Sequence, residues 1–442
     1  MRRRIFLISL GCVKNLVDSE HMLGLLKSRG FEVVSGVEKA QIIIINTCGF
    51  IRPAVEEAID TILEAVDLKR RGKVERVVVT GCFVQRYGYK LQREIPEVDG
   101  WLGTGEILRI VKMLENDSNY GGFYISRPTF VADHSIPRIQ TTPFYSSYLR
   151  VAEGCSHRCS YCMIPSLRGP FRSRRLDSLI AEAEEMALNG VKEINLIAQD
   201  TTMYGKDFRN GTSLIDLLER LTQIKEIRWI RLLYSHPSGV SDRLLELIDS
   251  EEAICPYLDL PFQHVNKFIL KTMRRDAEGE SPFNIIRRIR STKRKISLRS
   301  SFITGFPGES REMFEELLDF IEWARFDHLG VFVFSPEKGT RAARIGTEVE
   351  RAEAESRRDE IMRLQSTISE NINLKLLGTT VPVLIEGPSP ETDLLLKGRT
   401  VKMAPEVDGQ VLINKGTGIT GEIMNVLISE AYPYDLIGEI IE

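Results

Sequence analysis

The sequence has no apolar run long enough to cross a membrane as a helix. Such a helix needs about 20 consecutive, mostly apolar residues, and the most apolar stretch of this chain is the short isoleucine-rich run at residues 41–45. The N-terminus is basic and then apolar, but the apolar part is brief and no small-residue cleavage site follows it. It predicts a first strand and not a signal peptide. We therefore expect a cytoplasmic protein without membrane contact.

Charge of a single sign is also lacking. The 59 Lys and Arg residues are balanced by 62 Asp and Glu residues, which gives a net charge of −3. Local basic clusters occur at residues 172–175 and 287–295, but no overall basic field would gather nucleic acid. Histidine is scarce, with six residues, and no carboxylate or histidine dyad stands out. Histidines and carboxylates therefore do not indicate a catalytic site, and another residue type must carry the chemistry of this protein.

The length of 442 residues exceeds what one hydrophobic core usually organises, so we expect several domains. Within residues 1–116, apolar runs at 5–10, 41–45 and 76–79 alternate with amphipathic helical patterns. This alternation predicts a small doubly wound α/β domain. Residues 117–145 lose the periodicity and collect Asn, Gly, Pro, Ser and Thr, which is typical of a linker.

A longer α/β domain is predicted over residues 146–374. Strand patterns that each precede a helical pattern occur at residues 148–152, 193–198, 229–233, 257–260, 300–304 and 330–334. Six such units fit a partial (β/α)6 barrel of the TIM type better than a second doubly wound sheet, although the pattern separates the two only weakly. Active residues are then expected after the carboxyl ends of the strands.

The last segment, residues 375–442, carries short β-type runs between Gly and Pro turns, which predicts a small antiparallel barrel. Its five basic and ten acidic residues give it a net charge of −5. An acidic barrel is poorly suited to a phosphate backbone and favours a basic protein partner. We expect Glu406 and Asp408 to contribute to such a surface.

The seven cysteines carry the main evidence, because in a reducing compartment thiols bind metals more often than they form disulfides. Cys155, Cys159 and Cys162 form a CxxxCxxC motif in one predicted loop. Three thiolates leave one iron of a 4Fe-4S cluster open, and that iron can chelate S-adenosylmethionine. Reductive cleavage then releases a 5′-deoxyadenosyl radical. The alternative is a zinc site with a fourth ligand such as His157, but zinc sites more often use paired CxxC units.

A second group of cysteines is dispersed along the chain. Cys12, Cys48 and Cys82 each follow the end of one of the first three predicted strands. Parallel strands bring such positions together at one edge of a sheet. Any one of them could be a buried structural cysteine, as we expect for Cys255, but the recurrence favours a second 4Fe-4S cluster.

Polar and aromatic residues follow the strands of the larger domain, and some of them are expected to surround S-adenosylmethionine. For each, a cap, a turn or core packing is the alternative explanation. His264, in the same region, is expected to be an ordinary hydrogen-bonded residue. The expected contacts are Tyr161, Gln199, Asp200, Tyr234, Gln263 and Ile303.

These motifs together resemble the radical S-adenosylmethionine methylthiotransferase family over nearly the whole chain. The segment 10–20, opening Leu-Gly-Cys-Val-Lys-Asn, is similar to the signature of the branch that modifies a ribosomal protein, the RimO type, with Val13 where proline is common. The Gln-His pair at residues 263–264 and the segments 404–409 and 434–438 resemble the same branch. The resemblance implies a methylthiotransferase domain, a radical domain and a C-terminal TRAM domain.

The resemblance also implies the reaction. A methylthio group is added to the β-carbon of an aspartate in the twelfth small-subunit ribosomal protein, with two 4Fe-4S clusters and two molecules of S-adenosylmethionine. The expected partners are this ribosomal protein, bound through the acidic TRAM domain, an electron donor of the flavodoxin or ferredoxin type, and a sulfur donor.

Two other functions compete with this interpretation. A transfer-RNA methylthiotransferase acting on a modified adenosine shares the six cysteines, but it predicts a basic C-terminal barrel. An iron–sulfur electron carrier or scaffold without catalysis leaves the large six-strand domain unexplained.

Overall fold

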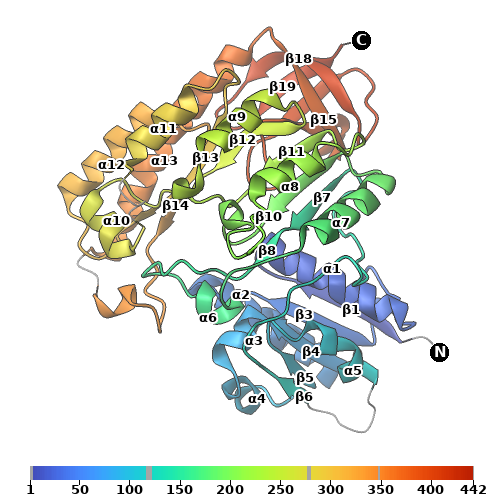
Figure 1. Cartoon of the computed structure of the whole chain (residues 1–442). Coiled ribbons are helices and arrows are strands. Elements are labelled where there is room, and N and C mark those ends of the chain that lie inside the picture. The colour runs from blue at the N-terminus through green and yellow to red at the C-terminus, as the bar shows by residue number, and fades with distance from the viewer. Residues whose placement is uncertain (1–2, 116–121, 276–279, 347–348, 442) are drawn as a thin grey trace.

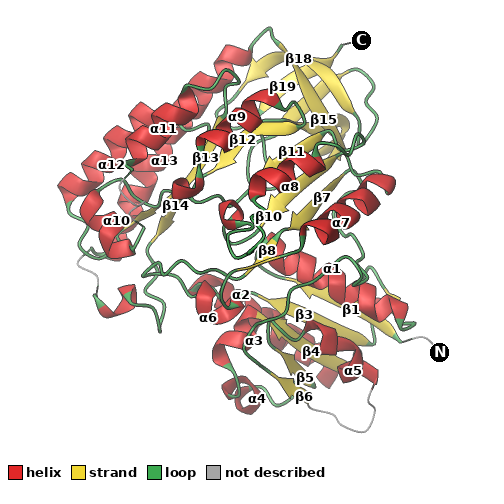
Figure 2. Ribbon diagram, viewed as in Figure 1, coloured by secondary structure: helices red, strands yellow, loops and turns green. Residues whose placement is uncertain are grey.

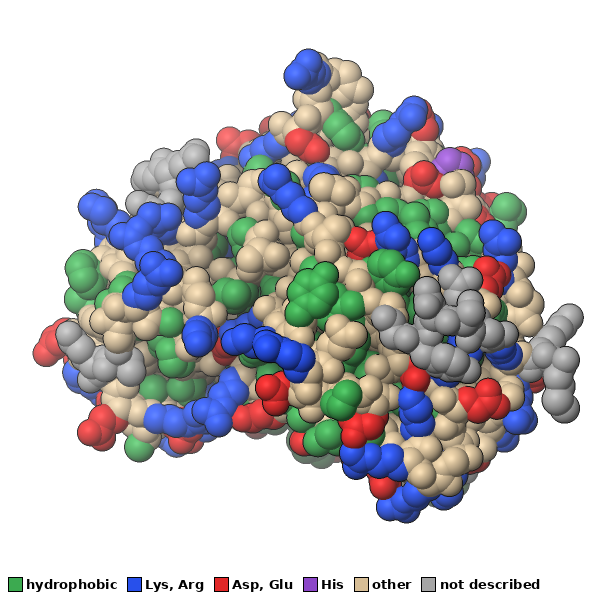
Figure 3. Space-filling view, turned by 90° about the horizontal axis from the view of Figure 1, so that it is seen from below, with side chains coloured by type: hydrophobic (Ala, Val, Ile, Leu, Met, Phe, Trp, Pro, Cys, Tyr) green, Lys and Arg blue, Asp and Glu red, His purple; other side chains and the backbone are tan. Residues whose placement is uncertain are grey.

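The structure is a computed structural model that describes residues 3–115, 122–275, 280–346 and 349–441. It has three parts, and the central part lies between the N-terminal domain and the C-terminal barrel (Figure 1). Positive and negative side chains are interspersed over the face seen in Figure 3. None of the described helices combines the length and the apolar character needed to span a membrane.

The N-terminal domain is built on a parallel sheet of order β2-β1-β3-β4-β5-β6. Alternate isoleucines of β3 point to opposite faces: Ile43 and Ile45 join one apolar cluster, and Ile42 and Ile44 join another. Helices therefore cover both faces, and the predicted doubly wound fold is confirmed. The strands are β1 Arg4–Ser9, β2 Glu32–Val33, β3 Ile42–Thr47, β4 Arg76–Gly81, β5 Gly100–Leu102 and β6 Gly122–Tyr124. The helices are α1 Val13–Ser28, α2 Arg52–Arg70, α3 Cys82–Tyr87, α4 Lys90–Glu94 and α5 Ile110–Glu115.

The segment that we expected to be a linker is not free of regular structure. Its residues Gly122–Tyr124 form β6, which pairs in parallel with β5 and ends the N-terminal sheet. A strand of three residues at the edge of a sheet is too short to show an alternating pattern, so no periodicity marks it in the sequence.

The central sheet has the order β14-β13-β12-β11-β10-β7, with every neighbouring pair parallel. The strands follow one another without a reversal, which is the winding of a barrel and not of a doubly wound sheet. The partial (β/α)6 barrel is confirmed. The strands are β7 Ser146–Arg150, β10 Glu193–Ile197, β11 Trp229–Leu232, β12 Ile254–Asp259, β13 Ser297–Thr304 and β14 His328–Val333.

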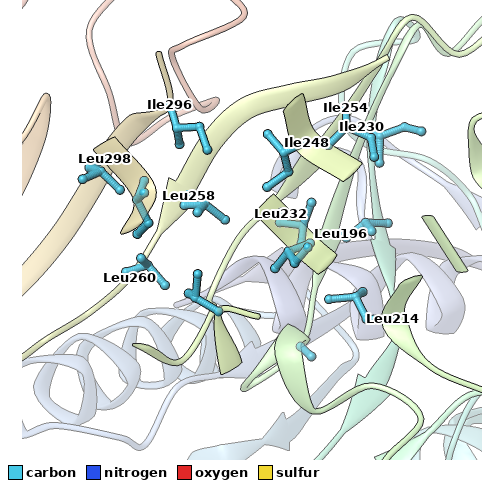
Figure 4. Close-up of a cluster of buried hydrophobic side chains, with 14 of the residues drawn as sticks. Leu196, Leu214, Ile230, Leu232, Ile248, Ile254, Leu258, Leu260, Ile296 and Leu298 are labelled. Atoms are coloured by element: carbon cyan, nitrogen blue, oxygen red, sulfur yellow. The ribbon is translucent and has the colours of Figure 1, made fainter. Parts of the chain in front are cut away.

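Helices cover the outer face of this sheet, and α11, α12 and α13 lie along one side of the molecule (Figure 2). Leucine and isoleucine side chains fill the space between strands and helices, as Figure 4 shows for Leu196, Leu232 and Leu258. The covering helices are α7 Leu176–Leu188, α8 Leu214–Leu221, α9 Asp242–Ser250, α11 Pro282–Arg290, α12 Arg311–Ala324 and α13 Arg351–Asn373. The carboxyl ends of the strands carry the shorter elements β8 Ala152–Glu153, α6 Ile164–Arg168, β9 Arg172–Ser173 and α10 Lys267–Met273.

The C-terminal segment closes into a barrel of order β15-β16-β17-β19-β18, as expected. Its neighbours are antiparallel except β17 and β19, which are parallel. A closed ring of five strands cannot alternate direction throughout, so at least one parallel pair is required. The strands are β15 Thr380–Ser389, β16 Thr392–Thr400, β17 Val411–Lys415, β18 Ile423–Ala431 and β19 Leu436–Ile440.

Buried charges join the barrel to the central domain. Arg399 of β16 donates to Glu193 of β10, with 2.7 Å between Nη2 and Oε2. Asp408 accepts hydrogen bonds from Arg299 and from the hydroxyl of Tyr257, and its side chain is fully buried. The expectation that Asp408 contributes to an outer acidic surface is therefore wrong, whereas Glu406 is exposed.

Candidate functional site

Cys12, Cys48 and Cys82 lie together at the carboxyl edge of the N-terminal sheet. Asn15, on α1, donates to the carbonyls of Leu10 and Thr47 at 3.0 Å and so ties together the ends of β1 and β3. Its amide oxygen lies 3.9 Å from the sulfur of Cys82.

Gly11, in the left-handed region with φ +86°, packs against the side chain of Cys48. A β-carbon at this glycine would lie 2.6 Å from the β-carbon of Cys48, so only glycine permits this close approach.

The environment of these thiols is partly buried and includes the guanidinium group of Arg168. Burial, followed by the nearby Cys12 and Cys48, raises the pKa of Cys82 to about 12. Arg168 opposes this shift. The guanidinium is 2% exposed and comes from α6 of the central domain. It donates to Asp18 at 2.7 Å and to the side chain of Asn15. The central domain thus supplies a positive charge to the N-terminal thiols.

The CxxxCxxC loop lies at the carboxyl edge of the central sheet. The amide of Cys155 donates to the carbonyl of Gly169 at 3.0 Å, and the amide of Ile164 donates to the sulfur of Cys162 at 3.4 Å. Arg275 lies with a guanidinium nitrogen 3.7 Å from the sulfur of Cys159. Burial is the main cause that raises the pKa of Cys155 to about 11 and that of Cys162 to about 12.

Each thiol group is a set of soft donors of the kind that can hold an iron–sulfur cluster. Among the residues that the structure describes, no three Cys, His, Asp or Glu side chains gather closely enough to hold one metal ion. His157, the alternative fourth zinc ligand, instead lies 2.6 Å from Asp200 through its Nε2. Thiols with a raised pKa become thiolates when a metal binds them, and soft thiolate sets are the ligands of iron–sulfur clusters.

Asp200 follows β10 at the carboxyl edge of the central sheet and contacts the CxxxCxxC loop. One of its carboxylate oxygens accepts from the amide of Thr202 at 3.0 Å and from the amide of His236 at 3.3 Å, and the other meets His157. The aspartate thus caps a short turn, as the alternative explanation proposed, and also holds the CxxxCxxC loop. Gln199, directly before it, is half-buried.

Two aromatic and apolar members of the expected set pack together. The ring of Tyr161 meets Phe306 edge-on, with 6.5 Å between the centroids. Ile303, 9% exposed, belongs to the same apolar cluster as Phe306. Much of the surface of both side chains is therefore covered by packing within the core. Cys255 is fully buried in another apolar cluster.

Tyr234 and Gln263 share a backbone conformation that the local sequence did not predict. Both follow strands of the central sheet, and both are in the left-handed region, with φ 58° and 71°. Non-glycine residues rarely adopt this conformation, and it concentrates at functional sites. His264, next to Gln263, accepts from the amide of Asn266 at 3.0 Å through Nδ1. Its Nε2 has no hydrogen-bond partner within the described part of the chain, so the histidine is only half satisfied.

Lys14 is a further residue of this site, and no motif in the sequence singles it out. The ammonium group of Lys14, on α1, lies 3.2 Å from the centroid of the Tyr234 ring. The lysine is 5% exposed. The contact joins the N-terminal thiol group to the rim of the central domain.

Comparison with known families divides the chain as the structure does. Residues 4–103 match the model of Uncharacterized protein family UPF0004, residues 149–321 match the Radical SAM superfamily, and residues 377–441 match the TRAM domain.

Relatives with assigned names are similar over the full length. The chain is 48% identical to the ribosomal protein uS12 methylthiotransferase RimO of Pelobacter propionicus, over 100% of this chain and 98% of that protein. It is 47% identical to the protein of the same name from Geotalea uraniireducens, over 100% and 99%.

Among solved structures, the radical S-adenosylmethionine methyltransferase TsrM of Kitasatospora setae matches with a TM-score of 0.54 and 15% identity. The match covers 77% of this chain and 74% of that chain. At this level of identity the match supports the fold alone.

Proposed function

The chain belongs to the ribosomal protein uS12 methylthiotransferases of the radical SAM superfamily, and we propose that it adds a methylthio group to the β-carbon of an aspartate in that ribosomal protein. It is a transferase, and its superfamily implies S-adenosylmethionine and a 4Fe-4S cluster. The observation that carries the proposal is that the N-terminal thiol group is in contact with the segment that follows the CxxxCxxC loop. Arg168 lies beside the first group, and it follows the last cysteine of the second by six residues.

We assign the two cysteine groups to different tasks. Cys155, Cys159 and Cys162 hold the cluster at which S-adenosylmethionine is cleaved, and Cys12, Cys48 and Cys82 hold a second 4Fe-4S cluster. When bound, the first cluster supplies the electron for radical formation, and the second supplies the methylthio group. The task of the chain is to hold both within reach of one carbon atom.

The residues at the carboxyl edge of the central sheet position the reactants. Tyr161 belongs to the CxxxCxxC loop and packs against the apolar cluster that contains Ile303, and Gln263 pairs with Phe302 of β13. Gln199 and Tyr234 follow the neighbouring strands β10 and β11. We retain all five as surroundings of S-adenosylmethionine. Asp200 acts in the same site by fixing the loop, because the protein's own donors already occupy both of its oxygens.

The acidic barrel supports a basic protein as substrate. Of its basic residues, Arg399 is buried and Lys415 is paired with Glu439. The exposed acids include Glu391, Glu406, Glu422 and Glu430. A basic ribosomal protein would be attracted to such a surface and transfer RNA repelled.

The same reaction needs an electron donor, for which we propose the flavodoxin or ferredoxin type, and a sulfur donor. A cytoplasmic location follows from the proposed substrate, since ribosomal proteins are assembled there.

The test is a direct comparison of the two candidate substrates. Anaerobically reconstituted protein is incubated with S-adenosylmethionine, a reductant, and either the ribosomal protein or transfer RNA. Mass spectrometry should find a methylthio adduct on an aspartate of the ribosomal protein only. An adduct on transfer RNA, with the ribosomal protein unmodified, contradicts the proposal.

A further inference from the structure

We propose that the ammonium group of Lys14 binds the side-chain carboxylate of the aspartate that is modified. The inference rests on the proposed function and identifies the residue that selects the target side chain. It starts from an unusual feature, which is a buried lysine that has no ion-pair partner among the described residues. Lys14 is 5% exposed, and within the described ranges no carboxylate forms an ion pair with it.

A buried ammonium group demands compensation, because removing a charge from water is costly unless an opposite charge replaces the solvent. The ring of Tyr234, 3.2 Å away, supplies part of it through a cation–π contact. Asp259 is close enough to interact with the ammonium electrostatically, but one of its oxygens accepts from the amide of Tyr234 at 3.0 Å, and it lies 3.9 Å from Arg299. The ammonium therefore keeps the capacity to bind an anion that enters from outside.

The position of Lys14 identifies that anion. Lys14 follows Cys12 by two residues, so it borders the N-terminal thiol group. Its contact, Tyr234, accepts at its carbonyl from the amide of Thr201 at 3.0 Å. The preceding Asp200 binds His157 of the CxxxCxxC loop. A short chain of contacts thus runs from one cysteine group to the other, and the ammonium lies in it.

The proposed reaction requires the substrate β-carbon to be within reach of both cysteine groups. The carboxylate of an aspartate is bonded to that carbon, so it lies beside the same contact. An ammonium–carboxylate pair would then fix the rotation of the side chain and present the β-hydrogen toward the CxxxCxxC loop. Selection of aspartate over asparagine follows, because the neutral amide would leave the buried ammonium without an anion.

A second role is possible for such a charge, namely compensation of the N-terminal thiolates. This role predicts an effect of Lys14 on the cluster and no dependence on the substrate side chain. The two roles are therefore separable by varying the enzyme and the substrate together.

The experiment is a double-mutant cycle on the full-length, reconstituted protein. Wild-type enzyme and Lys14→Met are each titrated, without turnover, with a peptide of the ribosomal protein that carries either the target Asp or Asn. The wild type should bind the Asp peptide about 10- to 100-fold more tightly than the Asn peptide, the usual range for a hydrogen bond to a charged group. Lys14→Met should bind both peptides equally, and Lys14→Arg should restore part of the preference.

Lys27→Met is the matched control, because Lys27 lies on the same helix and is exposed. This variant should keep the full preference for Asp. Iron content and the electronic spectrum of Lys14→Met should equal those of the wild type.

Persistence of the Asp preference in Lys14→Met overturns the inference, and so does an altered cluster spectrum with that preference intact, which indicates compensation of the thiolates. Equal binding of the two peptides by the wild type also overturns it. In that case, methylthiolation of the ribosomal protein by the same preparation would show that the proposed function still stands.

Discussion

Replacing Glu193 by Gln should loosen the C-terminal barrel from the central domain. Glu193 is fully buried on β10, where it accepts from Arg231 at 2.9 Å and from Ser146 at 2.8 Å. Arg399, which donates to it at 2.7 Å, belongs to β16 of the barrel. One carboxylate thus connects two domains, and its neutralisation would leave two buried guanidinium groups facing each other.

The size of the effect follows from the charge balance. Burial alone would raise the pKa of Glu193, but Arg399 and Arg231 overcome it and lower the pKa from 4.5 to about 2. This difference corresponds to about 3 kcal/mol of stabilisation at neutral pH. Breaking a buried ion pair by removal of one partner costs about 3–5 kcal/mol. We therefore expect Glu193→Gln to destabilise the docked barrel by about 3 kcal/mol.

Urea unfolding followed by the fluorescence of Trp229 measures this loss. Trp229 is 5% exposed and packs in an apolar cluster that also contains Leu384 and Ala404 of the barrel segment. Replacing Trp101 and Trp323 by Phe makes the signal specific for this interface. The control is Glu439→Gln on the same barrel, since its partner Lys415 is 78% exposed and the change should cost less than about 1 kcal/mol.

The stabilisation that Glu193 contributes should decrease as the pH falls. Because the folded-state pKa of Glu193 lies below that of the unfolded chain, the stabilisation is complete above pH 4.5 and is lost as the pH falls toward about 2. The difference in unfolding free energy between wild type and variant should therefore shrink below pH 4.5, by about 1 kcal/mol at pH 4. A variant within about 0.5 kcal/mol of the wild type at pH 7 would refute this reasoning.

Three further results are expected. Anaerobically reconstituted protein should contain about eight iron atoms per chain by chemical assay, and about four after joint replacement of Cys155, Cys159 and Cys162 by Ala; stoichiometric zinc without iron in freshly isolated anaerobic protein would contradict the assignment. Cys12→Ala, Cys48→Ala and Cys82→Ala should each retain cleavage of S-adenosylmethionine and lose methylthio transfer, measured by chromatography of 5′-deoxyadenosine and mass analysis of the substrate; equal loss of both activities in folded variants would argue against two tasks. Glu406→Lys should slow association with the ribosomal protein, with a smaller effect at high salt, as measured by stopped flow; an unchanged rate at low salt would exclude this acid from the docking surface.

The strands could be predicted, and so could the positions of the cysteines at the edges of the sheets, because both depend on local sequence. Apolar runs mark buried parallel strands, and the residue after such a run lies at the carboxyl edge of the sheet. Cys12, Cys48 and Cys82 needed no more than this rule to be placed together. The barrel winding of the central sheet was only weakly indicated, because strand order depends on contacts between distant segments.

The ionic contacts between domains could not be predicted. Glu193 and Arg399 are 206 residues apart, and Asp18 and Arg168 are 150 residues apart, so no local pattern marks them as partners. For the same reason the charge count of the barrel did not reveal that Asp408 is buried against Arg299. The left-handed backbone of Tyr234 was also hidden, since a tyrosine gives no sign of that conformation.

The most direct test of the account follows the hydrogen atom on the target carbon. The wild-type enzyme is given S-adenosylmethionine, a reductant, and a ribosomal protein whose target aspartate carries deuterium at the β-carbon. The account predicts that deuterium appears in 5′-deoxyadenosine and that the methylthio group is found on the same carbon. Methylthiolated aspartate formed without transfer of deuterium to 5′-deoxyadenosine would contradict it.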